Sequence, residues 1–357
     1  MSKKYDVYGI GNALVDIVTE VDNDFFVKNE VEKGVMTLVD EKRQQQLMKA
    51  IDMEKSRMSA GGSAANTVIG VNQFGGKSYY SCLVAKDQLG KFFLEDMKRN
   101  GVDTNLSYED CPQGHSGRCL VMTTPDADRT MNTFLGISSF MSVDQINEEA
   151  IISSTYAYLE GYLVSSPSGM EALLETKRIA EKNRVNTALT FSDPNMVRFF
   201  SKNFEQVVGA SVDLLFCNEE EALMFSETDN IRDAREKLKQ AAKRFAITLG
   251  ANGALIYDGD TFIEIEPYKV RALDTNGALI YDGDTFIEIE PYKVRALDTN
   301  GAGDMFAGAF LYGITHGHSY AQAGKIASLA SSRVVSQFGP RLEPQQAQRV
   351  LKDLIEQ

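Results

Sequence analysis

Apolar stretches of strand length alternate with amphipathic stretches of helix length along most of the chain. The stretch 87–101, for example, places Leu89, Phe92 and Met97 on one helical face and ends at a glycine. The predicted strands are 6–12, 155–163, 186–194, 212–218 and 246–250, and the predicted helices are 66–75, 87–101, 169–183, 231–245 and two or three helices within 303–356. This order predicts an α/β fold, a three-layer sandwich whose mainly parallel central sheet has helices on both faces.

Two segments interrupt this order. Residues 13–40 and 116–134 have the pattern of strands with no helices between them. Strands inserted into an α/β frame predict a small separate β-sheet, which would act as a lid over a site. The lid would be discontinuous in the sequence, and the large α/β nucleotide-binding domain would consist of 1–12, 41–115 and 135–357.

One stretch of the chain occurs twice in direct succession. Residues 252–275 recur letter for letter at 276–299. Each copy predicts one hairpin, made of the strand ALIY, the turn DGD and the strand TFIEIE. Two copies are too few for a stacked repeat protein, so a tandem duplication of one hairpin accounts for them best. Either copy could fill the hairpin position. Because lengthening a surface loop costs only about 0.6 kcal/mol per doubling, we expect the fold to survive the insertion.

The composition is that of a globular chain with an acidic surface. Of 357 residues, 43% are hydrophobic and 24% are charged, and the formal net charge is −13. Such an excess of negative charge repels phosphate backbones, so we do not expect nucleic acid as a partner. The sequence has no run of about 18 apolar residues and no long apolar stretch at its start, so we expect a cytoplasmic protein without a membrane partner. The four cysteines and three histidines are scattered, so neither disulfides nor a metal cluster is expected.

The motif DTNGAGD at 298–304 carries the strongest chemical signal. It opens a helix of small and apolar residues, and the N–H groups and dipole of a helix N-terminus stabilise anionic oxygens. A carboxylate in that first turn, at Asp304, could accept the proton of a hydroxyl that attacks a phosphoryl group. A capped helix with a glycine-rich entry is the structural alternative. The earlier DTNGA at 274–278 continues as LIYDG, so it lacks both the second glycine and the aspartate.

Three further motifs have both a ligand-binding and a structural interpretation. AGGSAAN at 60–66 combines close backbone approach with an asparagine amide, or is a tight turn. TLGANGA at 248–254 leaves room for a flat ligand after a strand, or is a turn. NEEEA at 218–222 places oxygen ligands for Mg²⁺ at the end of a strand, or is a solvated helix start. A dinucleotide site is not expected, because GIGN at 9–12 lacks the third glycine, and the sequence has no Walker A loop.

Taken in order, these motifs resemble those of the ribokinase or PfkB family of sugar and nucleoside kinases. The resemblance covers nearly the whole chain, with GG-x-x-x-N from Gly61, N-x-x-E from Asn218, T-L-G-x-x-G from Thr248 and D-T-x-G-A-G-D from Asp298. It implies ATP-dependent phosphorylation of a hydroxymethyl group by an αβα sandwich with a small β-sheet lid. It also implies Mg²⁺ as a cofactor, and it is compatible with a monovalent cation and with either a monomer or a homodimer.

The resemblance further implies a role for each matched residue. Asp304 would be the catalytic base, and the backbone N–H groups of Gly301, Ala302 and Gly303 would form the anion hole. The other implied roles are contacts to sugar hydroxyls by Asn12, Asp16, Gly62 and Asn66; a lid contact to the transferred phosphate by Arg129; Mg²⁺–phosphate binding, through water, by Asn218 and Glu221; and nucleotide binding by Thr248, Gly250 and Gly253.

The expected acceptor is adenosine. GN-x-L-x-D-I at 11–17 and the asparagine of DTNGAGD are similar to adenosine kinases, whereas GGSAANT departs from the usual eukaryotic form and is also met in bacterial sugar kinases. Ribose, fructose or another nucleoside is therefore an alternative acceptor, and a kinase-like fold that binds a nucleoside or sugar without turnover is a different class. Because the duplicated segment lies between two motifs that face the nucleotide in the family, we expect it to weaken ATP binding.

Overall fold

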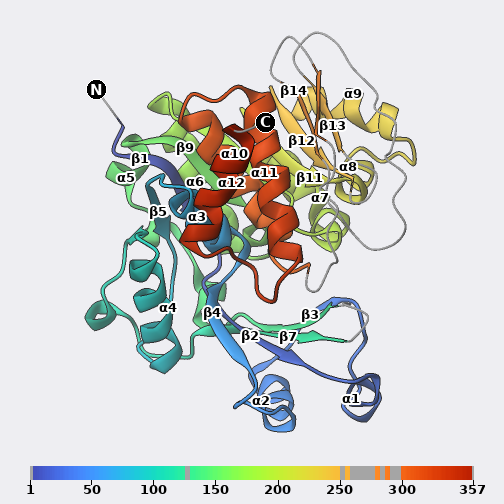
Figure 1. The fold of residues 1–357 in the computed structure, drawn as a ribbon. Helices are drawn as coiled ribbons and strands as arrows, with labels where there is room; N and C mark the ends of the chain where they lie inside the picture. The colour runs from blue at the N-terminus through green and yellow to red at the C-terminus, as the bar shows by residue number, and fades with distance from the viewer. Residues whose placement is uncertain are drawn as a thin grey trace.

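The structure, a computed structural model, describes residues 3–124, 129–249, 254–257, 278–281, 286–289 and 299–355. Within these residues the chain forms a large sheet and a smaller separate sheet (Figure 1). Seven described strands of the large sheet are parallel and lie in the order β12, β11, β10, β9, β1, β5 and β6. Their bounds are β1 Tyr5–Ile10, β5 Ser78–Ser81, β6 Asp103–Thr104, β9 Ser154–Glu160, β10 Asn186–Thr190, β11 Leu214–Asn218 and β12 Phe245–Thr248.

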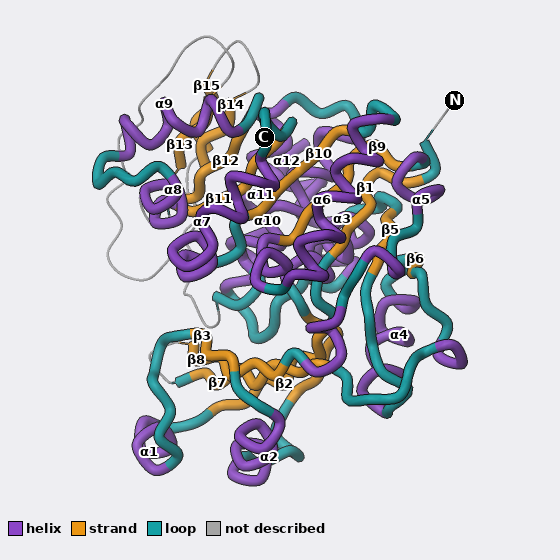
Figure 2. The backbone as a smooth tube through the Cα atoms, turned by 180° about the vertical axis from the view of Figure 1, so that it is seen from behind, coloured by secondary structure: helices purple, strands orange, loops and turns teal. Residues whose placement is uncertain are grey.

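Helices cover both faces of the large sheet, which confirms the predicted α/β sandwich (Figures 1 and 2). Helices α3, α10, α11 and α12 pack together on one face, and α5 to α9 lie on the other. The bounds are α3 Ser63–Gln73, α4 Gln88–Arg99, α5 Glu148–Ile152, α6 Pro167–Lys182, α7 Pro194–Val208, α8 Glu219–Phe225, α9 Ile231–Ala241, α10 Ala302–Thr315, α11 Tyr320–Val335 and α12 Pro344–Ile355. None of the helices in the described part of the chain is long and apolar enough to cross a membrane.

Helices α3 and α10 cross at two glycines. A Cβ on Gly308 would lie 2.5 Å from the carbonyl oxygen of Thr67 and 3.2 Å from the Cα of Gly70, so only glycine permits this approach. Asn66 and Asp304 each lie one helical turn before one of these glycines. The close crossing therefore brings these two polar side chains together.

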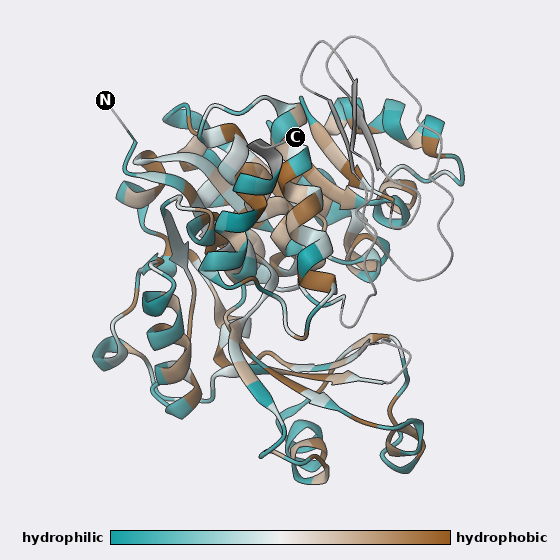
Figure 3. Ribbon diagram, in the orientation of Figure 1, coloured by the Kyte–Doolittle hydropathy of each residue, from teal (hydrophilic) through white to brown (hydrophobic). Residues whose placement is uncertain are grey.

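The smaller sheet has five strands within the described residues and is mixed, in the order β3, β8, β7, β2 and β4. Its strands are β2 Leu14–Glu20, β3 Met36–Leu38, β4 Arg57–Gly61, β7 Gly117–Thr123 and β8 Arg129–Phe134. The segments 13–40 and 116–134 both contribute to it, and β4 joins it as a strand that the sequence pattern did not assign there. Hydrophobic residues run along β2 and β7 (Figure 3).

The prediction of strands without intervening helices is wrong for 13–40. Helix α1, Asn23–Lys28, lies between β2 and β3, and its N-cap Asp22 accepts a hydrogen bond from the Phe25 N–H at 2.9 Å. A helix of six residues is shorter than two turns, so it leaves no helical period in the hydrophobic pattern. Helix α2, Glu41–Ala50, follows β3.

The remaining predicted strands and helices of the central layers are confirmed, several of them with shorter bounds. The strand predicted at 186–194 ends at Thr190, and helix α7 begins at Pro194. The strand predicted at 155–163 ends at Glu160, where a 3₁₀ turn begins. The helix predicted at 231–245 ends at Ala241, and Phe245 already belongs to β12. The described residues of 303–356 include three helices, α10, α11 and α12.

Both copies of the repeat contribute a strand beside β12. Their ALIY sequences form β13, Ala254–Tyr257, and β14, Ala278–Tyr281. Both strands are antiparallel to β12, with β13 opposite 245–246 and β14 opposite 247–248. The second copy continues into β15, Phe286–Ile289, which pairs with β14 as predicted for the hairpin. The DGD turns and the TFIEIE of the first copy lie outside the described residues.

Candidate active site

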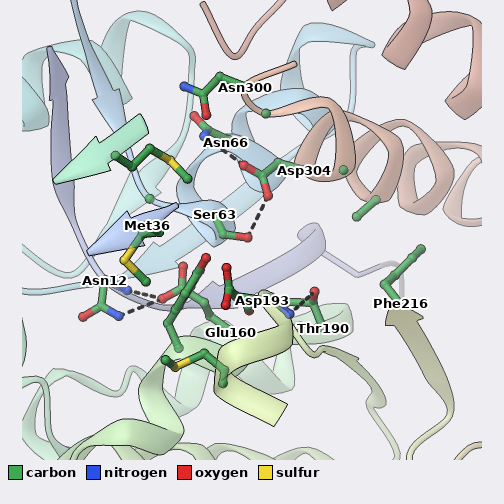
Figure 4. A pocket seen from close by; sticks show the side chains of 18 of the residues that line it. Asn12, Met36, Ser63, Asn66, Glu160, Thr190, Asp193, Phe216, Asn300 and Asp304 are labelled. Atoms are coloured by element: carbon green, nitrogen blue, oxygen red, sulfur yellow. Dashed lines mark hydrogen bonds between the residues drawn. The ribbon is translucent and has the colours of Figure 1, made fainter. Parts of the chain in front are cut away.

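A cavity of about 380 Å³ lies at the carboxyl ends of β9 to β12, beside the N-termini of α3 and α10 and the smaller sheet (Figure 4). Open α/β sheets bind ligands at this edge. The cavity brings together most of the residues predicted for the site, namely Asn12, Asp16, Gly62, Asn66, Asn218, Glu221, Thr248, Gly301, Ala302, Gly303 and Asp304.

Helix α10 begins in a glycine-rich turn that faces open space. Its N-cap Gly301 has a φ of 72°, and a Cβ there would lie 2.4 Å from the Cβ of Pro340, so glycine is required. A Cβ on Gly303 would meet nothing within 4 Å in the described part of the chain. The first N–H groups of a helix have no partner within the helix, although the Ala302 N–H lies 3.4 Å from the carbonyl oxygen of Thr299. The turn therefore offers an anion both a helix N-terminus and room to approach it.

Asp304, in the first turn of α10, has a carboxylate oriented by two donors from α3. The Ser63 hydroxyl donates to Oδ1 at 2.7 Å, and the Asn66 amide donates to Oδ2 at 3.0 Å (Figure 4). Hydrogen bonds to an ionised acceptor are stronger than neutral ones, so they fix the direction of the carboxylate. The side chain thus has a defined position next to the open space at Gly303.

Asn12 and Glu160 form a second hydrogen-bonded pair in the cavity. Glu160 Oε2 accepts from the backbone N–H and the amide of Asn12 at 2.6 and 3.1 Å, and Oε1 accepts from the Ala64 N–H at 2.9 Å. Burial raises the pKa of Glu160 to about 7, and the nearby carboxylate of Asp304 acts in the same direction. The Asn12 amide oxygen accepts from the Ser138 hydroxyl at 3.2 Å. Both ends of the Asn12 amide are therefore engaged within the protein.

Asn218 and Glu221 form a capping box at the start of α8. The Asn218 side chain accepts from the Glu221 N–H at 2.8 Å, and the Glu221 carboxylate accepts from the Asn218 N–H and amide at 2.9 and 3.0 Å. Burial raises the pKa of Glu221 to about 8. The motif NEEEA is therefore a helix start, but its Glu221 is buried rather than solvated. Both side chains also line the cavity.

The polar groups at this edge fit a magnesium ion that keeps most of its water. Among the described residues, no three His, Cys, Asp or Glu side chains are grouped so that they could hold a metal ion. Mg²⁺ is commonly bound by one or two carboxylates, several waters and substrate phosphates. Glu221 and Asp193 supply carboxylates in the cavity, and the space at Gly303 would admit a phosphate.

The remaining predicted site residues are Thr248 and Asp16, which line the cavity, and Arg129, Gly250 and Gly253, which the structure describes only in part or not at all. Thr248 ends β12 and lines the cavity, and Asp16 lies on β2 with only 5% of its surface exposed. Arg129 begins β8, but its side chain is outside what the structure describes. Gly250 and Gly253 also lie outside the described residues.

The smaller sheet contributes a mainly apolar wall to the cavity. Alternate residues of its strands face the cavity, as the period of a β-strand requires. The residues of this wall are Leu14, Asp16, Met36, Leu38, Cys119, Met131, Thr133 and Leu135. Leu14 and Cys119 pack with Val18 and Val121 in a small cluster that is separate from the main core. Asp16 is the one carboxylate within this set.

Ser63, Glu160 and Asp193 are among the residues of the site that the sequence motifs did not predict. Glu160 ends an apolar strand at the carboxyl edge of the sheet, which is where a polar residue can signal a site. Asp193 precedes a proline as the N-cap of α7, so its pattern is that of a cap. The contact of Ser63 with Asp304 spans 241 positions and leaves no local pattern.

The model of the pfkB family of carbohydrate kinases matches this chain in two segments, residues 35–287 and 275–347. Together they cover most of the chain. The two segments overlap at 275–287, which lies almost wholly in the second copy of the repeat. An overlap of the two matched segments within the repeat is what a duplicated hairpin would produce, because the same part of the family model then matches the chain twice.

Similar proteins include both nucleoside and sugar kinases. Adenosine kinase 2 of Arabidopsis thaliana is 26% identical over 95% of this chain and 96% of that protein, and 5-dehydro-2-deoxygluconokinase of Clostridium beijerinckii is 27% identical over 77% and 78%. Among solved structures, a probable sugar kinase from Rhizobium etli matches at 30% identity with a TM-score of 0.84, covering 99% of both chains. The adenosine kinase from Sinorhizobium meliloti matches at 32% identity with a TM-score of 0.83, covering 97% of this chain and 99% of that one.

Proposed function

We propose that this chain, which belongs to the pfkB family of carbohydrate kinases and is a phosphotransferase with an alcohol group as acceptor, phosphorylates the 5′-hydroxymethyl group of a nucleoside. Adenosine is the proposed acceptor, ATP the donor and AMP the product. The observation that carries the proposal is the orientation of the Asp304 carboxylate. Ser63 and Asn66 hold it beside the open N-terminus of α10.

Asp304 is the proposed general base. As the acceptor oxygen forms its bond to the γ-phosphorus, the bond to the bridging oxygen of ADP breaks and the hydroxyl proton passes to Asp304. The N–H groups of Gly301, Ala302 and Gly303 would donate to the oxygens of the transferred group and stabilise their negative charge. The dipole of α10 adds to this effect, because its positive end faces the same point.

Binding ATP in this cavity requires positive charge, because ATP is anionic and the lining includes the carboxyl groups of Asp16, Glu160, Asp193, Glu221 and Asp304. Mg²⁺, when bound, would neutralise the phosphate charge. We assign Asn218 and Glu221 to hold it through water, and Thr248, with Gly250 and Gly253, to the nucleotide. Arg129 is assigned to the transferred phosphate.

The apolar wall supports a nucleoside rather than a free sugar as the acceptor. A free sugar needs hydrogen bonds around its ring, whereas a purine brings a flat aromatic surface that apolar side chains can cover. Met36, Leu38 and Met131 supply such a surface in the cavity. In the proposal, Asn12, Asp16, Gly62 and Asn66 contact the ribose hydroxyls. The segments 13–40 and 116–134, with β4, would form the lid over them.

A sugar kinase acting on ribose or fructose is the second candidate, because the similar structures include a probable sugar kinase. A member that binds a nucleoside or sugar without turnover is the third. ADP release from Mg·ATP, measured with adenosine, ribose and fructose separately and beside a blank without acceptor, separates the three. We expect turnover with adenosine. The kcat/KM for ribose and fructose should be at least about tenfold lower than that for adenosine, because these sugars lack the adenine ring.

Turnover with a sugar alone would identify a sugar kinase, and adenosine binding without turnover would identify a non-catalytic member. The same assay on a chain lacking 252–275 tests the cost of the second hairpin. We expect a lower KM for ATP in the shortened chain. If neither chain releases ADP with any acceptor, the nucleoside kinase proposal fails.

A further inference from the structure

A nearly buried ion pair lies behind the site, on the far side of Asn66 from Asp304. Arg341, in the segment between α11 and α12, donates through Nη1 to Asp96 Oδ2 at 2.9 Å, and both side chains are about nine-tenths buried. The Nε of Arg341 donates to Asn66 Oδ1 at 3.1 Å. The motifs that predicted the site include neither Arg341 nor Asp96.

The chemistry of these groups fixes which end of the Asn66 amide faces Asp304. A guanidinium has five N–H donors and no acceptor, so the Asn66 atom that faces Arg341 must be the oxygen. The amide nitrogen must then point to the other side, where it donates to Asp304 Oδ2 at 3.0 Å. Without Arg341 the amide could rotate and turn its oxygen toward the carboxylate, where the two acceptors would repel each other.

The same segment of the chain also contacts the other parts of the site. Pro340 lies against Gly301 so closely that a Cβ on the glycine would overlap it. Asp96 Oδ2 accepts from the Ala60 N–H of β4 at 2.9 Å. Residues 340–341 therefore support the N-cap of α10 and, through Asp96, the strand of the smaller sheet that leads into α3.

We propose that Arg341 and Asp96 are positioning residues for phosphoryl transfer. Arg341, anchored by Asp96, locks the Asn66 amide so that its NH₂ group holds the Asp304 carboxylate in the direction needed to accept the proton. The inference rests on the proposed role of Asp304 as the base. Neither residue touches the reacting atoms, so their effect reaches the reaction through Asn66.

The test is a set of substitutions read in kcat and KM separately. Arg341→Met should lower kcat with adenosine and Mg·ATP about tenfold, since misplacing a catalytic group costs one to two orders of magnitude. The KM for ATP should stay within about twofold, because the direction of Asp304 is disturbed and the nucleotide contacts are kept. Arg341→Lys, which has only donors, should recover part of kcat, and Arg341→Gln, whose amide can present its oxygen, should not.

A double-mutant cycle separates positioning from general damage. If Arg341 acts through Asn66, adding Arg341→Met to Asn66→Ala should cause no further loss of kcat. Arg341→Met with Asp96→Leu removes both charges, so it avoids leaving one buried charge unpaired and guards against a folding failure. Arg333→Met is the matched control, because it breaks the exposed Arg333–Asp353 pair of the C-terminal helices, and it should leave kcat unchanged.

Two kinetic outcomes would overturn the inference: a kcat for Arg341→Met within about twofold of the wild-type value, or the same fold loss in the Asn66→Ala background. If the wild-type chain turns over no acceptor, the proposed function fails, and a neutron crystal structure of Arg341→Met, which distinguishes the amide nitrogen from the oxygen, still decides the positioning. An Asn66 amide that keeps its hydrogen bond to Asp304 in that structure refutes the inference. A rotated or displaced amide supports it.

Discussion

The wall of the cavity formed by α10 and the strand ends is polar and hydrogen-bonded, whereas the wall formed by the smaller sheet is mainly apolar. On the first wall, Asp304 and Glu160 each accept two or more hydrogen bonds from residues distant in sequence. On the second, Met36 and Met131 present flexible apolar side chains, and Asp16 is the one carboxylate among the described side chains that line the cavity. The first wall is built to hold a few atoms in fixed directions, and the second to cover a surface.

This difference assigns separate kinetic roles to the two walls. Fixed donors and acceptors at a reacting atom stabilise the transition state more than the ground state, so their loss lowers kcat. Apolar cover stabilises the bound substrate and the transition state equally, so its loss raises KM. Substitutions on the two walls should therefore separate along kcat and KM.

The largest effect is expected for Asp304→Asn. Losing a general base should lower kcat about a hundredfold to ten-thousandfold. The dissociation constant for adenosine should change by less than about threefold, because the turn at the start of α10 stays in place. Stopped ADP-release assays give kcat, and calorimetric titration gives the affinity.

Ser63→Ala is the graded control for this variant. It removes one of the two donors from α3 to Asp304 and leaves Asn66 in place, so we expect a loss in kcat of about tenfold at most. An Asp304→Asn variant with near-wild-type kcat would exclude Asp304 as the base.

A smaller effect, confined to KM, is expected for Met36→Ser. Burying a methionine side chain is worth about 1.5–3 kcal/mol. Because Met36 would cover only part of the adenine ring, its loss should raise the KM for adenosine about tenfold. Met58→Ser is the control, since Met58 lies on β4 of the same sheet, is 45% exposed and lies outside the cavity lining. A KM for adenosine that is unaffected by Met36→Ser would show that the apolar wall does not cover the substrate.

The anion-binding role of the turn is tested by Gly303→Ala. The new methyl group would enter the open space beside the N–H groups, so kcat/KM for ATP should fall about tenfold or less. The melting temperature should hold or rise, because alanine favours the helix by about 0.5–1 kcal/mol. Gly301→Ala should instead lower the melting temperature, because of its φ of 72° and its contact with Pro340. If Gly303→Ala binds and turns over ATP normally, the phosphates do not approach this turn.

The smallest effect is expected for Glu160→Gln, which should change how the free energy of unfolding depends on pH. Burial raises the pKa of Glu160 from an ordinary value near 4.5 to about 7, so the folded state holds a proton that the unfolded state releases. Its contribution to stability is full below about pH 4.5 and is lost as the pH rises through 7. Glu160→Gln should therefore flatten the fall in unfolding free energy between about pH 5 and pH 7, by up to about 1.4 kcal/mol per pH unit.

Urea unfolding at several pH values measures this slope. Glu205→Gln, at an exposed position of α7, should leave it unchanged. If the Glu160→Gln slope equals that of the wild type, Glu160 does not carry a raised pKa in the folded protein.

The alternation of strands and helices in the sequence was enough to predict most of the central layers, because most of these elements carry their own hydrophobic period. Strands β5 and β6 and helix α7 were not predicted. The predicted site residues that the structure describes lie mostly in one cavity for a related reason. Asn66, Asn218 and Asp304 sit in short motifs at the ends of strands or the starts of helices, and these ends meet at one edge of the sheet.

The residues that sequence analysis missed act through contacts that span the chain. Ser63 and Glu160 gain their roles only once α3 crosses α10 and Asn12 meets the end of β9. Met36 and Met131 follow ordinary strand alternation, so nothing in the pattern marks them as cavity residues rather than core. Helix α1 was missed because six residues are too short to show a period.

The most direct test of the account is to identify the phosphorylated product of the 357-residue chain by phosphorus NMR after incubation with Mg·ATP and adenosine. The account predicts equal amounts of AMP and ADP from the wild-type chain, and at least about a hundredfold less of both from Asp304→Asn over the same incubation time. Inorganic phosphate and ADP without AMP would show transfer to water rather than to adenosine. That result would contradict a nucleoside kinase.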